Sequence, residues 1–220
     1  RIILVELTEI LASRAIRLFQ LSKSGGGAYI PDLIKRIATK YDFAIYPADI
    51  KILEENHLSF KHGKFQNKLI DELKIYNDGI IVDTKNTVED ADALIDDLIN
   101  WALETYQYSI KSLPPVRRYY HSHLEVRLDL DIDEWLSQLK PILEQINFSL
   151  KESGTVSAPF HMFGFSMHFD IASASIELPG AFNFERRFKQ PFEYKIYSTV
   201  APLRTKDHID LIKKIEEMAK

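Results

Sequence analysis

Residues 68–106 constrain the fold of this chain most, because they predict a strand, a tight turn, a second strand and a long helix in succession. Apolar and polar residues alternate over the first strand, and its apolar side consists of Leu69, Leu73 and Ile75. This period of two is typical of a strand with one buried face. Asp71 interrupts the apolar side, so we expect the strand to begin near Glu72.

The turn and the helix of this segment are indicated by separate signals. Asn77-Asp78-Gly79 supplies residues that tolerate the positive φ angles of a hairpin turn, and Ile80 to Val82 form the returning strand. Asn86 and Glu89 resemble a capping box, so a helix should begin near Thr87. Its apolar residues recur at spacings of three and four, as a buried stripe requires: Ala91, Leu94, Ile95, Leu98, Trp101, Ala102 and Tyr106.

The acidic residues of this helix have ordinary structural explanations. Negative charge near the positive end of the helix dipole is supplied by Glu89, Asp90 and Asp92. Three polar residues lie off the apolar stripe, so we expect them to face water: Asp96, Asp97 and Asn100. We therefore interpret residues 68–106 as a scaffold and not as a functional site.

The chain before this segment predicts helices and one further strand. We interpret residues 2–7 as a short strand. A helix should follow it, because apolar residues then recur at helical spacing: Leu7, Leu11, Ala15, Leu18 and Phe19. A second helix should begin at Pro31, and residues 48–55 predict a short third one. A strand from Leu58 that turns at Gly63 completes a three-stranded antiparallel meander.

Residues 121–130 contain the clearest strand pattern of the second half. One face is apolar and consists of Leu124, Val126, Leu128 and Leu130. The other face is polar and consists of His121, His123, Glu125, Arg127 and Asp129. Because side chains alternate across a strand, we expect the first face to be buried and the second to be a candidate for chemistry.

The rest of the second half predicts a helix, three strands and a final helix. Asp131 should cap the helix with Glu134, and Pro141 should break it near Leu139. The three strands are expected at residues 160–171, 174–184 and 192–200. The final helix should begin at Thr205, with Ile209, Ile212, Ile215 and Ala219 on its buried side.

These elements predict an α+β fold in which antiparallel meander sheets are each flanked by amphipathic helices. Pro114-Pro115 cannot continue a helix, so the two halves should be joined near this segment. We expect a first domain at residues 1–112 and a second at residues 119–220, with one continuous domain as the alternative.

Composition excludes several classes of protein. The absence of cysteine excludes disulfides, cysteine-ligated metal centres and thiol nucleophiles. A net charge of -4 and a pI near 6.0 argue against a dedicated duplex-DNA binder, although local basic patches remain compatible with them. No apolar run reaches the roughly 18 residues of a membrane span, so we expect no membrane-spanning helix. The missing cysteines do not fix the compartment, and we take the cytoplasm as the default. The start at Arg1 without a methionine indicates that residue 1 is not the natural start.

Two pairs of side chains are candidate metal ligands. His121 and His123 point the same way from one strand, and His168 and Asp170 do so from another. If the two strands were neighbours with their polar faces together, three imidazoles and a carboxylate would converge on a divalent transition metal. The alternative is a solvated sheet face with no cofactor, on which such residues pair across strands.

Two segments that combine cations with aromatic rings are candidate partner-binding surfaces. The first consists of Arg117, Arg118, Tyr119 and Tyr120, and the second of Phe184, Arg186, Arg187 and Phe188. Aromatic residues and arginine are the usual anchors of protein interfaces. The same combination also holds single-stranded nucleic acid, through stacking and phosphate contacts.

The sequence contains no catalytic signature, so elimination decides between the possible functions. We interpret the chain as a soluble intracellular structural or protein-interaction subunit that acts in a homo- or hetero-oligomer. One alternative is a metal-dependent enzyme with a His/Asp site on a sheet face. The other alternative is a single-stranded nucleic-acid-binding module, which the acidic net charge disfavours.

Overall fold

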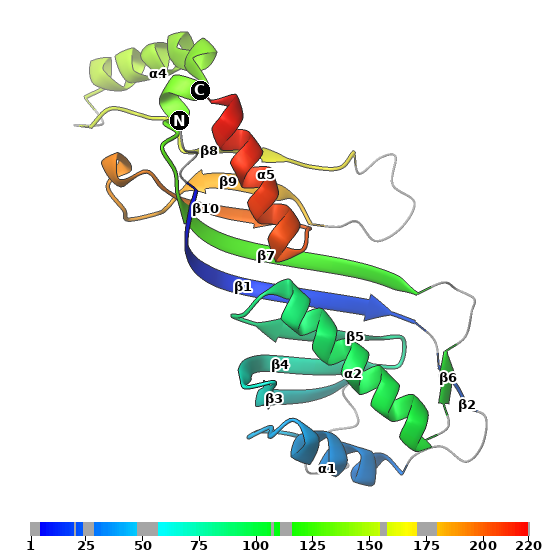
Figure 1. The fold of residues 1–220 in the computed structure, drawn as a ribbon. Coiled ribbons are helices and arrows are strands. Elements are labelled where there is room, and N and C mark those ends of the chain that lie inside the picture. Colours follow the sequence, from blue (N-terminus) through cyan, green and yellow to red (C-terminus); the bar gives the residue numbers. More distant parts are fainter. Residues whose placement is uncertain are drawn as a thin grey trace. The chain divides into compact units, whose positions relative to one another are not determined.

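The computed structural model describes residues 5–19, 21–23, 29–47, 57–106, 108–110, 116–154, 158–170 and 180–219 (Figure 1). The strands in these ranges are β1 Glu6–Leu18, β2 Leu21–Lys23, β3 His57–Phe65, β4 Lys68–Tyr76, β5 Gly79–Thr84, β6 Tyr108–Ile110, β7 Arg117–Arg127, β8 Gly164–Met167, β9 Phe182–Arg186 and β10 Ile196–Ala201. The helices are α1 Ile30–Lys40, α2 Val88–Tyr106, α3 Ile132–Trp135, α4 Lys140–Glu152 and α5 Thr205–Met218, with 3-10 turns η2 Ser137–Leu139 and η4 Phe192–Tyr194.

The predicted α+β class is confirmed. Eight strands form an antiparallel sheet in the order β3-β4-β5-β1-β7-β10-β9-β8, and β2 pairs with β6 in a separate ribbon. Within the described ranges, no helix combines the length and the apolar character needed to cross a bilayer. Pro114 and Pro115, which we predicted at the junction of the halves, lie outside the described residues.

The contacts divide the chain into two compact units. Unit 1 consists of Arg1–Glu9, Leu124–Val200 and Ile209–Lys220, and unit 2 of Ile10–His123 and Ala201–His208. Both β1 and β7 therefore contribute residues to each unit. The predicted domain boundary at residues 112–119 stays a prediction.

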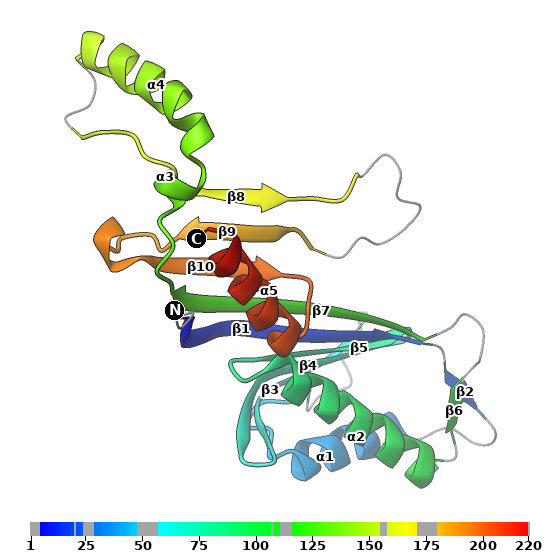
Figure 2. The ribbon, with the colours of Figure 1, turned by 45° about the horizontal axis from the view of Figure 1, so that its top comes forward.

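The core of unit 2 lies between its helices and its strands. The meander β3-β4-β5 has the predicted antiparallel pairing, and β1 pairs with β5 from Ser13↔Thr84 to Leu18↔Gly79. Figures 1 and 2 show α1 and α2 on the same side of these strands. One buried cluster joins them and includes Ala15, Ile37, Phe60, Leu73, Val82, Leu94 and Ile95.

The helix predicted after residue 7 is wrong, because that part of the chain forms strand β1. Ser13, Ala15, Arg17 and Phe19 are buried at a period of two, which is the strand pattern. A serine and an arginine stand on this buried face, so hydrophobicity alone did not reveal the alternation. Arg17 can be buried because it pairs with Asp92 and Asp96 of α2.

The first hairpin of the meander turns later than predicted. Gly63 lies within β3, and the turn is formed by Gln66 and Asn67 at φ 49° and 63°. Strand β4 begins at Lys68 and not near Glu72. Leu69 is exposed, whereas its neighbour Ile70 is buried. The alternation of buried and exposed side chains shifts by one residue between Ile70 and Leu73, opposite the part of β3 where His62 has a φ of 56°. The second turn lies at Asn77 and Asp78 as predicted.

Gly63 provides a first test of the packing in unit 2. A Cβ atom built at Gly63 would collide with the ring of Phe43, which belongs to the buried core. We expect Gly63→Ala to lower the free energy of unfolding by about 1–2 kcal/mol, as overpacking does. Urea denaturation would measure this change, with Gly180→Ala as the control because nothing lies within 4 Å of a Cβ atom there. Equal stability of the two variants would contradict the tight contact.

Helix α2 begins where the sequence indicated, but a different pair of residues caps it. The Thr87 hydroxyl and the Asp90 carboxylate exchange hydrogen bonds with each other's backbone N–H groups at 3.2 Å. This capping box lies one residue after the predicted pair of Asn86 and Glu89. Asn86 instead donates its side-chain amide to the backbone oxygen of Leu69.

In unit 1, the predicted apolar face of β7 is confirmed. Leu124, Val126, Leu128 and Leu130 are buried. The predicted break near Leu139 is also confirmed, because η2 ends at Leu139 and α4 begins at Lys140 with Pro141 in its first turn. Asp131 caps α3 by accepting the N–H of Asp133 at 2.9 Å. In α5, Ile212 and Ile215 are buried as predicted.

The three predicted strands of unit 1 are shorter than expected. Strand β8 spans only four residues, β9 begins at Phe182, and residues 171–179 lie outside the described ranges. Phe192 and Tyr194 belong to a 3-10 turn, because Lys195 at φ 50° separates them from β10. The buried face of β10 consequently consists of Tyr197, Thr199 and Ala201.

Candidate functional site

The four predicted metal ligands belong to β7 and to the segment that follows β8. His121 and His123 lie on β7 in unit 2, whereas His168 and Asp170 follow the end of β8 in unit 1. In the strand order, β10 and β9 come between β7 and β8, so these strands are not neighbours. Across the part of the chain that the structure describes, no group of three or more His, Asp or Glu side chains could hold a metal ion.

A third histidine of unit 2 is electrostatically coupled to the pair on β7. His208 in the first turns of α5 is fully buried. Burial, and next the charges of His123 and His121, lower the pKa of His208 to about 4. Burial and the charge of Arg14 also lower the pKa of His121, while Asp83 acts in the opposite direction.

Two of the predicted partner-binding residues take part in an ionic network inside unit 2. Asp92 is its centre, and we name it the Asp92 network after this residue. The carboxylate accepts hydrogen bonds from Arg17, from the Tyr120 hydroxyl at 3.2 Å and from Arg204 at 3.3 Å. Arg118 lies 3.7 Å away. Arg204 also donates to the Tyr120 oxygen at 3.0 Å and covers its ring, so Tyr120 is fixed within the fold.

Two residues of the second predicted partner-binding segment are buried in the core of unit 1. Phe184 is fully buried and stacks between Phe165 and Tyr197, with ring centroids 5.4 and 4.7 Å away. Arg186 is buried against Asp131 and Asp133 at 3.1 and 3.3 Å.

The remaining partner-binding candidates are accessible to different degrees. Arg187 pairs with Glu125 at 2.7 Å, and Phe188 is 72% exposed. At the start of β7, Arg117 and Arg118 are exposed and Tyr119 is partly buried. Of the eight residues, Arg117, Arg118 and Phe188 therefore offer the most surface to a partner.

Exposed apolar side chains are frequent in unit 1, and helix α4 contributes two of them. Although its sequence is amphipathic, α4 has no buried residue among those described. We call the following set the exposed apolar surface of unit 1: Ile142, Phe148, Phe160, Phe163, Met167, Phe169, Phe188, Phe192 and Tyr194. Large exposed apolar surfaces on a folded protein mark interaction sites.

Local contacts bring several members of this surface close to one another. The Asn147 side chain of α4 accepts the N–H of Phe160 at 2.6 Å and donates to its carbonyl oxygen at 3.1 Å. The next residue, His161, meets the ring of Phe192 edge to face at 5.5 Å and contacts Asp133 at 3.0 Å. Helix α4, the Phe160 segment and the Phe192 turn are thus joined by contacts.

Comparisons with known proteins add no functional information. No protein-family model matches the chain, and no curated protein matches its sequence. The residues of this structure therefore carry the whole functional argument.

Proposed function

We propose that this chain is a structural or protein-interaction subunit that acts in the cytoplasm within a homo- or hetero-oligomer. The exposed apolar surface of unit 1 would be its interface. The observation that carries this proposal is helix α4, which is amphipathic but buries no residue in the described part of the chain. Helices in proteins gain most of their stability by packing an apolar face, so a partner is the natural cover for this one.

The chemistry of the surface supports a protein as the partner. Phenylalanine, tyrosine and methionine are enriched in the centres of protein interfaces, and these residue types make up most of the set. Phe148 is 62% exposed and Phe188 is 72% exposed, so both side chains would lose a large apolar area to water on association. The apolar area that aromatic side chains bury dominates the energetics of protein interfaces.

The proposal predicts that a charge on the apolar side of α4 weakens association. We expect Ile142→Glu to raise the dissociation constant of the oligomer by roughly tenfold or more, because Ile142 is 59% exposed on the apolar side and a buried unpaired carboxylate is costly. Gln145→Glu adds the same charge at an exposed position of α4 away from the apolar side and is the control. Sedimentation equilibrium of the full chain would measure the effect on self-association. Co-purification from the native source would measure the effect on a hetero-oligomer.

Two results would contradict this function. One is a strictly monomeric wild-type chain from which no partner co-purifies. The other is equal association of the Ile142→Glu and Gln145→Glu variants. Circular dichroism of both variants would establish that any difference in association does not arise from unfolding of α4.

A further inference from the structure

A hollow on unit 2 combines cations with an indole ring. It lies between helices α1 and α2, has a volume of about 470 Å³, and is lined by Lys35, Arg36, Thr39, Lys40 and Trp101. The hollow is shallow and open to solvent, because four of its five lining residues, all on α1, are exposed. We call this feature the α1/α2 hollow.

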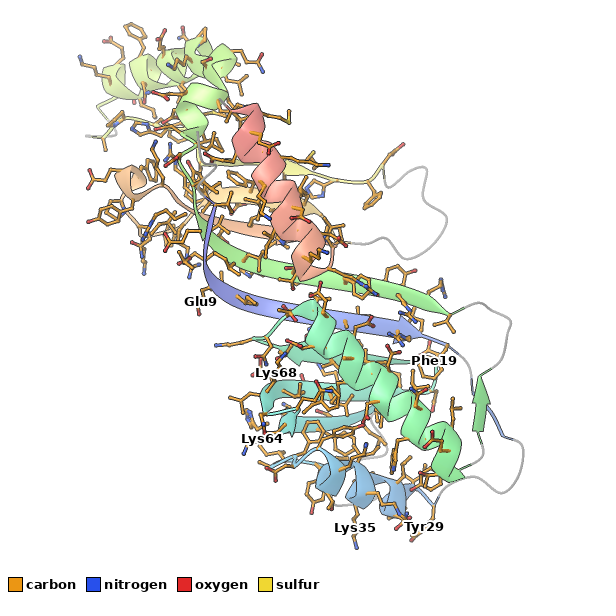
Figure 3. The ribbon with its side chains drawn as sticks, in the orientation of Figure 1. Glu9, Phe19, Tyr29, Lys35, Lys64 and Lys68 are labelled. Carbon is orange, nitrogen blue, oxygen red and sulfur yellow. The ribbon has the colours of Figure 1, made fainter. Side chains whose placement is uncertain are left out.

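The charges around the α1/α2 hollow favour an anion. Arg36 pairs with Asp32 at 2.8 Å and Lys40 pairs with Asp97 at 3.0 Å, so these two cations are already compensated. Lys35 forms no ion pair within the described part of the chain, and Figure 3 shows it extending outward from α1. Lys35 is one of the lining residues, and its flexible stem allows this uncompensated ammonium to turn towards a bound anion. This local excess is positive, although the whole chain has a net charge of -4.

Trp101 gives the hollow a flat apolar wall. The side chain is partly buried and packs against the core of unit 2, and the Tyr106 ring meets it edge to face at 5.7 Å. Its position is therefore held from behind by the fold. The aliphatic stems of the lysines and of Arg36 extend the apolar lining around the indole. An aromatic base can stack on such a wall, which is worth about 1–3 kcal/mol per base in single-strand binding proteins.

We propose that the α1/α2 hollow binds a nucleotide, with the base against Trp101 and the phosphate near Lys35. A phosphate alone would leave the indole unused, and an uncharged ring would leave the ammonium unused. The Thr39 hydroxyl adds a neutral hydrogen-bonding group to the lining. The nucleotide can be a free mononucleotide or a residue of a single-stranded nucleic acid, since both carry the same base and phosphate.

Fluorescence of Trp101 is the direct test, because stacking of a base quenches an indole. Trp135→Phe removes the second tryptophan, which lies in unit 1, so that Trp101 becomes the sole reporter. The full-length variant is titrated with AMP, adenosine, inorganic phosphate, a short single-stranded oligoadenylate and a short oligoglutamate. We expect saturable quenching by AMP and the oligoadenylate, and at least roughly tenfold weaker binding of adenosine and of phosphate.

Charge variants decide whether the hollow itself is responsible. Lys35→Glu should weaken AMP binding roughly tenfold, whereas Lys85→Glu, an exposed change of the same charge on the same unit, should change it less than about twofold. Much tighter, salt-sensitive binding of the oligoadenylate would assign the site to a strand, and equal binding per nucleotide would assign it to the free nucleotide.

Three results would overturn the nucleotide site. These are the absence of quenching by both AMP and oligoadenylate, equal weakening by Lys35→Glu and Lys85→Glu, and oligoglutamate binding as tight as that of oligoadenylate. None of these measurements depends on the interface of unit 1, so the nucleotide site and the proposed subunit function can fail separately.

Discussion

Replacing Asp92 by alanine is expected to lower the free energy of unfolding by about 3–5 kcal/mol, which is a large part of the stability of a typical domain. The side chains of Arg17 and Asp92 are only 4% and 8% exposed. Removing the carboxylate would leave the Arg17 guanidinium buried with Asp96 as its remaining acidic partner, and the Asp96 side chain is 51% exposed. A buried charge that loses its partner costs far more than the intact pair contributes.

Asp96→Ala is the matched control for this prediction. Asp96 lies one helical turn after Asp92 and pairs with the same Arg17, but it is half exposed. Pairs with an exposed member usually contribute about 0–1 kcal/mol, so we expect a loss in that range. Urea denaturation of both variants, followed by circular dichroism, would measure the difference. If Asp92→Ala and Asp96→Ala lost equal stability, the burial of the Asp92 network would play no energetic role.

A double variant separates the ion pair from the packing around it. In Arg17→Met/Asp92→Leu both charges are replaced by apolar side chains, so neither is left buried without its partner. Such replacements are often neutral or stabilising, and we expect this variant to recover most of the stability lost in Asp92→Ala. The two residues are in contact, so their effects should not be additive.

The sequence predicted those elements whose side chains follow hydrophobic periodicity. Helix α2, the meander and the apolar face of β7 belong to this class, because Leu94, Val82 and Leu124 all stand on regular apolar faces. Strand β1 was missed because Arg17 stands on its buried face. A charged residue in the core can be predicted from the sequence only when its ion-pair partners are known. Asp92, which pairs with Arg17, lies on a helix 75 residues further along the chain.

The candidate sites were less predictable than the elements that carry them. Asp92 and Asp96 are four residues apart on α2 and pair with the same cation, Arg17. This spacing could have indicated a shared partner, but we attributed the two acids to the helix dipole and to a solvated face. Trp101 was assigned to the buried stripe of its helix, whereas the structure leaves part of it to line the α1/α2 hollow. The burial of His208 was not predictable from the sequence, because it depends on parts of the chain far apart in sequence, including the strand whose His121 and His123 act on its pKa.

Acidification should destabilise the protein through His208. Its pKa is about 4 in the folded chain, where burial and the charges of His123 and His121 oppose protonation, against an ordinary value of 6.5. Between these two values the unfolded chain binds more protons than the folded chain, so stability falls as the pH falls from about 6.5 towards 4. A shift of this size corresponds to about 3 kcal/mol for complete protonation of the unfolded chain, and the loss is absent above pH 7.

The pH dependence of a His208→Gln variant isolates this effect from other titrating groups. Removing a buried side chain will change the stability at every pH, so the quantity to compare is the loss of unfolding free energy between pH 7.5 and pH 4.5. We expect the wild-type chain to lose about 2 kcal/mol more than His208→Gln over this interval, measured by urea denaturation. His62→Asn is the control, because His62 is exposed and asparagine tolerates its positive φ of 56°. Identical pH profiles for the wild-type chain and His208→Gln would show that His208 does not resist protonation in the fold.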